Sequence, residues 1–251
     1  MTSGRGYRGG FNPFRDSHGR WGTAATHVGS AAPPLAVAGG GAQINAAIRQ
    51  ATGRGAPAVP RSYGGDYTPA AAATLREQED RLRPQAFESI AIIGPDGALR
   101  AFVDGKALSV KLTNAQMKLL PGAILTHNHP TIPGDGFAET SFSGPDIIAG
   151  FHSGESETRA VTTRYNHVAQ YRKPGTQEPL NRTLTNEENF DIFLGLGDAY
   201  DYDHKAPPAQ RRQQLEASVH AENIAMAKKY GYVYYREDLQ TGEIEGYGHD
   251  V

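Results

Sequence analysis

The chain has 251 residues, with 25 Lys and Arg against 27 Asp and Glu, which gives a formal net charge of −2 at pH 7. This balance argues against nucleic acid as a partner, because proteins that bind phosphate backbones carry a basic excess. The sequence contains no Cys, so disulfides, cysteine zinc fingers, iron–sulfur clusters and thiol nucleophiles are excluded, and any metal must bind to His and carboxylate side chains.

Residues 1–70 are rich in Gly, Ala, Pro, Arg and Ser and have few large apolar side chains. Such a segment cannot bury enough apolar surface to offset the entropy that it loses on ordering. We therefore expect a flexible, disordered N-terminal leader over residues 1–70 and a folded domain over residues 71–251. Apolar residues at helical spacing leave a short helix over Ala42–Ala51 as the alternative for that part of the leader.

The first predicted elements of the folded domain are a helix and a β-hairpin. Thr68-Pro69 is typical of a helix start, and Arg83-Pro84 ends the mixed-charge stretch that follows it. The β-branched run Glu88–Ile93 predicts a strand, and the Gly-Pro-Asp-Gly sequence after it predicts a turn into a second strand over Ala98–Val103. Leu108–Leu112 is a possible third strand of the same sheet.

A short helix and a buried strand are expected next. Thr113 and Gln116 have the spacing of a capping box, which predicts that a helix begins after Thr113. Ile124-Leu125-Thr126 predicts the end of a buried strand, so His127 and His129 stand where that strand exits the sheet. Because side chains alternate along a strand, both imidazoles are expected on one side and the residue between them on the other.

The sequence Ser143-Gly144-Pro145-Asp146 predicts the start of another helix. Ser is a good N-cap, Pro is tolerated in the first turn, and Asp at the third position suits the helix dipole. Apolar patterning then predicts strands over 158–163 and 165–171, helices over 186–200 and 208–230, and a strand over 232–236. This mixture predicts an α/β (α+β) fold in which helices flank a mixed sheet. No apolar run approaches the roughly 20 residues of a membrane helix, so we expect no membrane partner.

Three of these residues have the chemistry of a metal site. His127, His129 and Asp146 supply the three nitrogen and oxygen ligands that a hydrolytic zinc site takes from a protein. An ordinary alternative exists, in which the histidines are surface side chains and Asp146 interacts only with the helix dipole. A strand that ends in His-x-His-Pro, followed by a helix that opens with Ser-x-x-Asp, favours the metal site, with Zn²⁺ as its ion.

These motifs resemble the signature of the JAMM (JAB/MPN) metalloproteases, which consists of an upstream Glu, a His-x-His-Pro and a Ser-x-x-Asp. The Thr-His-Asn-His-Pro form is most similar to the RadC-like and bacteriophage members, over roughly Glu88–Tyr171 and more weakly over Ala221–Tyr235. The resemblance implies a JAB/MPN-like curved mixed β-sheet flanked by helices and a zinc-dependent peptidase or isopeptidase that acts on a protein or peptide. It also implies a phage or prophage origin.

The family's functional residues match individual positions of this chain. The resemblance implies that His127, His129 and Asp146 bind zinc and that Ser143 stabilises the tetrahedral intermediate of the substrate. It implies that Glu88 is the catalytic Glu, which holds the attacking water and moves its proton. A single carboxylate can serve as base for the water and as acid for the departing amine. Other carboxylates at Glu77, Glu79 and Glu139 leave alternatives open for this role.

Two features leave other functions open. The connection from Pro130 to Phe142 is longer than is usual in the family, which fits either a reshaped substrate groove or a site that has lost its activity. Residues 12–21 resemble a short stretch near the start of phage head-associated proteins, with a basic disordered tail as the alternative. A non-catalytic phage structural or interaction protein and a RadC-like DNA-processing accessory are therefore the competing hypotheses. The expected location is the host cytoplasm or the virion.

Overall fold

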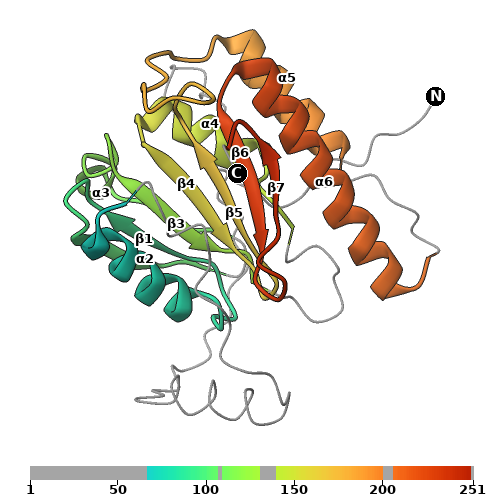
Figure 1. The fold of residues 1–251 in the computed structure, drawn as a ribbon, viewed down its shortest axis with the longest axis horizontal. Coiled ribbons are helices and arrows are strands. Elements are labelled where there is room, and N and C mark those ends of the chain that lie inside the picture. The colour runs from blue at the N-terminus through green and yellow to red at the C-terminus, as the bar shows by residue number, and fades with distance from the viewer. Residues whose placement is uncertain (1–66, 107–108, 131–139, 200–205, 250–251) are drawn as a thin grey trace, which may run out of the picture. The chain divides into compact units, whose positions relative to one another are not determined.

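The computed structural model describes residues 67–106, 109–130, 140–199 and 206–249, which form a seven-stranded mixed β-sheet flanked by helices (Figure 1). The strand order is β2-β1-β3-β4-β5-β6-β7. Among the described strands, β3 and β4 pair in parallel and all other neighbours pair antiparallel. The predicted α/β class and mixed sheet are thus confirmed, whereas the leader predicted over 1–70 and its alternative helix lie almost wholly outside the described residues.

The strands in chain order are β1 Ser89–Ile93, β2 Leu99–Asp104, β3 Ile124–Asn128, β4 Glu157–Val161, β5 Tyr165–Gln170, β6 Val233–Asp238 and β7 Ile244–Tyr247. The described helices are α2 Pro69–Leu82, α3 Asn114–Met117, α4 Gly144–Ser153, α5 Asn186–Asp198 and α6 Pro208–Tyr230. No described helix combines the length and the apolar character that crossing a membrane requires.

Local signals fix where several of these helices begin. The Thr68 side chain accepts a hydrogen bond from the Ala71 N–H, with Pro69 at the first position of α2. A capping box formed by Thr113 and Gln116 opens α3, as the sequence predicts. The sequence predicts these helix starts correctly because the capping hydrogen bonds join residues only three positions apart.

The two faces of the sheet carry separate parts of the core. On one face, Leu75 and Leu82 of α2 are buried, Leu75 against Ile93 and Leu82 against Val161. On the other face, helices α4, α5 and α6 cover β4 to β6 through an apolar cluster that includes Ile147. The strand alternation that sends Thr126 to the α2 face sends His127 to the face of α4.

A buried charge cluster joins α2 to the sheet. The fully buried guanidinium of Arg159 on β4 pairs with Glu79 of α2 and, at 2.8 Å, with Glu157. The hydroxyl of Tyr67 donates to the Glu157 carboxylate at 2.6 Å. Charged groups withdrawn from water are stable only when they are paired and hydrogen-bonded, so this cluster links the helix to this face of the sheet.

The sequence prediction is wrong at two places in the sheet. Residues 109–112 form no strand, and only an isolated bridge joins Lys106 and Ser109. Val110 and Leu112 instead pack against the cluster around Ile90, so their apolar character reflects side-chain packing rather than strand pairing. Strand β7 was not predicted, because it is short and half-exposed and therefore has only a weak apolar pattern.

Candidate metal centre

The structure brings His127, His129 and Asp146 together. The Nε2 atoms of His127 and His129 are 3.0 Å apart, and each lies 3.8 Å from one carboxylate oxygen of Asp146. The potential ligand atoms all lie within 4.8 Å of one another. Within the described part of the chain, no other group of three His, Asp or Glu side chains has this spacing.

The topology explains why the three side chains meet. His127 is the fourth residue of β3 and His129 follows its last residue, so strand alternation places both on one face. Helix α4 lies on the connection between the parallel strands β3 and β4, and it therefore starts near the end of β3 where the chain exits. Asp146 is in the first turn of α4, which completes the group.

The donor set fits a divalent cation. The Nδ1 atom of His129 lies 2.7 Å from the carbonyl oxygen of Thr140, and because a carbonyl can only accept, Nδ1 carries the proton and Nε2 keeps its lone pair. Two nitrogen ligands about 2.0–2.1 Å from a tetrahedral zinc are about 3.3–3.4 Å apart, close to the separation of these two imidazoles. The geometry therefore supports a metal ion without fixing which metal it is.

Burial keeps His127 in the form that binds metals. The ring is nearly inaccessible to solvent, and this burial lowers the pKa of His127 to about 4. The negative charge of Asp146 acts in the opposite direction but does not compensate. His127 is therefore neutral at neutral pH, so a metal ion need not displace a proton from it.

Ser143 lies beside the ligand group, where it holds Asp146. Its backbone N–H and its hydroxyl donate to the same oxygen, Oδ2 of Asp146, at 2.8 and 2.7 Å. Ser143 is the N-cap of α4, as predicted, and Asp146 is the third residue of the helix. The hydroxyl to which the resemblance assigns a catalytic role thus bonds a candidate metal ligand in this structure.

Glu88 lies at the same end of the sheet as the ligands. Ile90 of β1 pairs with His127, and Glu88 directly precedes β1, so Glu88 lies just beyond the paired residues at the end of the sheet where His129 follows β3. Burial, and secondarily the negative charge of Asp146, raises the pKa of Glu88 to about 8. A carboxyl group with this pKa is suited to exchange protons near neutral pH.

The alternative carboxylates do not share this place. Glu79 bonds Arg159 on the α2 face of the sheet, opposite to the face of His127. Glu77 is exposed on α2, and Glu139 lies outside the described residues. Among the described candidates, the structure therefore leaves Glu88 as the carboxylate beside the ligand group.

Asn128 lies beside the candidate site and holds a neighbouring segment, a role that the sequence did not predict. Its side-chain Oδ1 accepts from the Ser89 N–H at 2.7 Å, and its Nδ2 donates to the carbonyl oxygens of Phe87 at 3.0 Å and Gln85 at 3.4 Å. These bonds hold the backbone on both sides of Glu88. Strand alternation predicts that Asn128 points away from the imidazoles, but no sequence pattern identifies its partners.

We expect Asn128→Ala to destabilise the metal-free protein by about 1–3 kcal/mol, because the buried Ser89 N–H would lose its acceptor. Urea unfolding followed by circular dichroism measures this free energy. Asn189→Ala is the matched control, since Asn189 bonds His152 at the exposed surface of α4 and α5. Equal losses in the two variants would contradict the role given to Asn128.

The comparisons with known proteins add no family to this site. Searches with protein-family models, curated proteins and solved structures find no significant match to the chain. A fold class alone does not specify an activity. Any functional conclusion for this chain therefore rests on the residues and geometry of the candidate metal centre.

Proposed function

We propose that the chain is a zinc-dependent hydrolase of the JAMM type that cleaves an amide bond in a protein or peptide, as a peptidase or isopeptidase. The observation that carries the proposal is the convergence of His127, His129 and Asp146 on one point, with Glu88 beside them. These are the positions that match the JAMM motif in the sequence. The mixed sheet flanked by helices is compatible with a JAB/MPN-like fold.

In the proposed chemistry, three residues hold the cation and Glu88 transfers the proton. A divalent cation held by His127, His129 and Asp146 would polarise the substrate carbonyl and lower the pKa of a coordinated water toward about 7. Glu88 takes the proton from the attacking water and passes it to the nitrogen of the departing amine, so the carboxylate is regenerated. The positive charge of a cation at the ligand group would favour the ionised form of Glu88. The pKa of Glu88 would then be lower than its raised value in the metal-free site.

Ser143 contributes in one of two orientations. With its hydroxyl on Asp146 Oδ2, it fixes the ligand carboxylate. Turned toward the substrate, the same hydroxyl would donate to the oxygen of the carbonyl under attack and stabilise its developing negative charge. The backbone N–H of Ser143 holds Asp146 in both cases.

A second candidate is a non-catalytic phage structural or interaction protein that keeps the metal centre for stability. The hydroxyl of Ser143 favours this candidate, because it already donates its proton to Asp146 and in this orientation does not donate to a substrate. Both candidates fit a phage or prophage origin and a location in the host cytoplasm or the virion, with a phage structural protein as the partner of the second. A RadC-like role in DNA processing is the least supported, since the net charge of −2 offers no basic excess.

Metal analysis of untagged protein, purified without chelators, tests the proposal. We expect about one zinc ion per chain by elemental mass spectrometry, and cleavage of a peptide or isopeptide library that stops with chelator and resumes with zinc. Failure to bind zinc even after titration would overturn the proposed zinc centre. Stoichiometric zinc without any cleavage would overturn the peptidase and favour the structural candidate.

A further inference from the structure

The segment Thr140–Ser143, which we call the ligand strap, contacts all three metal ligands. Its first residue accepts from His129 through the carbonyl of Thr140, and its last residue holds the carboxylate of Asp146. Between them, the ring of Phe142 lies 6.2 Å from the ring of His127, centroid to centroid. A shift of the strap would therefore move the ligands relative to one another.

Buried polar groups from the C-terminal elements hold this strap. The hydroxyl of Ser141 lies 2.7 Å from the hydroxyl of Tyr234 on β6, which in turn lies 2.7 Å from Nδ1 of His220 on α6. The Asn223 side chain on α6 donates to the carbonyl of Phe142 at 3.0 Å. All of these side chains are buried, so no solvent competes for the bonds.

The donors and acceptors in this series of hydrogen bonds can be assigned consistently. A carboxylate oxygen of Glu245 lies 3.3 Å from Nε2 of His220, which favours a proton on that nitrogen and leaves Nδ1 as an acceptor. Tyr234 then donates to His220 and accepts from the hydroxyl of Ser141. The Tyr234 hydroxyl thus has one donor role and one acceptor role in the bridge, and the Ser141 hydroxyl uses its proton to reach Tyr234.

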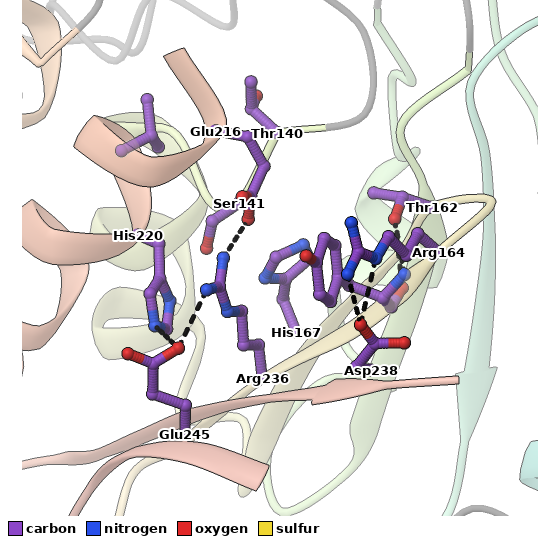
Figure 2. A network of polar contacts seen from close by, with 12 residues as sticks. Thr140, Ser141, Thr162, Arg164, His167, Glu216, His220, Arg236, Asp238 and Glu245 are labelled. Carbon is purple, nitrogen blue, oxygen red and sulfur yellow. Dashed lines mark hydrogen bonds and ion pairs between the residues drawn. The ribbon is translucent and has the colours of Figure 1, made fainter. Parts of the chain in front are cut away.

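The far end of the bridge is anchored by charges, as Figure 2 shows. Arg236 on β6 pairs with Glu216 of α6 and with Glu245 of β7, the latter at 2.8 Å. His220 lies next to Glu245 in the same view. These ion pairs join α6, which carries His220 and Asn223, to β6, which carries Tyr234, and to β7.

We propose that Tyr234 is a positioning residue for the metal centre and acts through Ser141 on the ligand strap. His220 supports Tyr234, and Asn223 holds the strap directly through the carbonyl of Phe142. This inference rests on the metal centre of the proposed function. Hydrogen bonds behind a first ligand shell orient the ligands and commonly change metal affinity about 10–100-fold. Helix α6 and strand β6 therefore contribute to metal binding, although they supply no ligand.

Tyr234→Phe and Tyr232→Phe form a matched pair of variants. Both side chains are fully buried and only two residues apart, but the Tyr232 hydroxyl has no hydrogen-bond partner among the described residues. We expect Tyr234→Phe to weaken zinc binding about tenfold and Tyr232→Phe to leave it within about twofold, measured by competition with a chromophoric chelator. The visible absorption of bound Co²⁺ should change in Tyr234→Phe alone, because it reports ligand geometry rather than stability.

A double-mutant cycle with Ser141→Ala tests the route of the effect. If Tyr234 acts through Ser141, adding Tyr234→Phe to Ser141→Ala should cause almost no further loss of affinity. Additive losses, or wild-type affinity and Co²⁺ absorption in Tyr234→Phe, would overturn this inference while leaving the metal centre intact. Absence of zinc binding by the wild-type protein would instead overturn the metal centre itself, and this inference with it.

Discussion

His129→Ala should reduce zinc affinity by more than about 100-fold, beyond the range produced by changes behind the ligand shell. The variant keeps His127 and Asp146, but two ligands cannot complete a tetrahedral site. His129 is the better of the two histidines to replace, because His127 is almost fully buried and its loss would leave a cavity. Isothermal titration with Zn²⁺ measures the change directly.

The control for this prediction is His152→Ala, which removes an exposed imidazole from the same helix that carries Asp146. Its zinc affinity should equal that of the wild type. Thermal unfolding gives a second readout, because an ion at about 100 times its dissociation constant stabilises the folded state by about 2.7 kcal/mol. Zinc should therefore raise the melting temperature of the wild type and of His152→Ala, and an equal rise in His129→Ala would place the metal elsewhere.

Glu88→Gln should bind zinc as tightly as the wild type but lose about 10²–10⁴-fold in kcat, the usual contribution of a general acid–base group. Gln keeps the shape of the side chain and removes its ability to exchange a proton. The measurement is turnover of the substrate identified in the cleavage screen, with zinc affinity determined on the same sample. Glu77→Gln, on the exposed side of α2, is the matched control and should keep full activity.

The metal-free form of the same variant gives a pH test that needs no substrate. The pKa of Glu88 rises from 4.5 to about 8 on folding, so its contribution to stability is complete below pH 4.5 and is lost as the pH rises through 8. Gln does not titrate and shows no such loss. The free energy of unfolding of Glu88→Gln should therefore increase relative to the wild type between these pH values. A constant difference between the two proteins would show that Glu88 is not held in its neutral form by its surroundings.

The ligand group could be predicted from the sequence because it depends on local rules. Strand alternation places His127 and His129 on one face, and the capping pattern of Ser143 places Asp146 in the first turn of α4. Glu88 required the family resemblance, since the sequence offered four candidate carboxylates, and only the structure places Glu88 at the end of the sheet where His127 lies, within electrostatic reach of Asp146.

The surroundings of the ligand group could not be predicted, because they depend on contacts between distant parts of the chain. Asn128 bonds a segment about 40 positions earlier, and Tyr234 reaches Ser141 across 93 positions. Neither contact leaves a periodic pattern, since each is set by how strands and helices pack together. The error at residues 109–112 has a similar origin, because apolar alternation alone does not distinguish a segment that packs against the face of a sheet from a strand that pairs within the sheet.

The buried pair between Arg159 and Glu79 bears on where a minimal autonomous fragment of this protein can begin. A fragment that starts at Pro84 would keep Glu88, Ser143 and the three candidate metal ligands but would lose α2. Arg159 would then lack Glu79, and Glu157 would lack the hydroxyl of Tyr67. The same face of the sheet would also lose the apolar contacts of Leu75 and Leu82. Truncated versions for crystallisation or for activity assays should therefore begin before Tyr67, because Tyr67 and helix α2 are an integral layer of the folded unit rather than a dispensable tail.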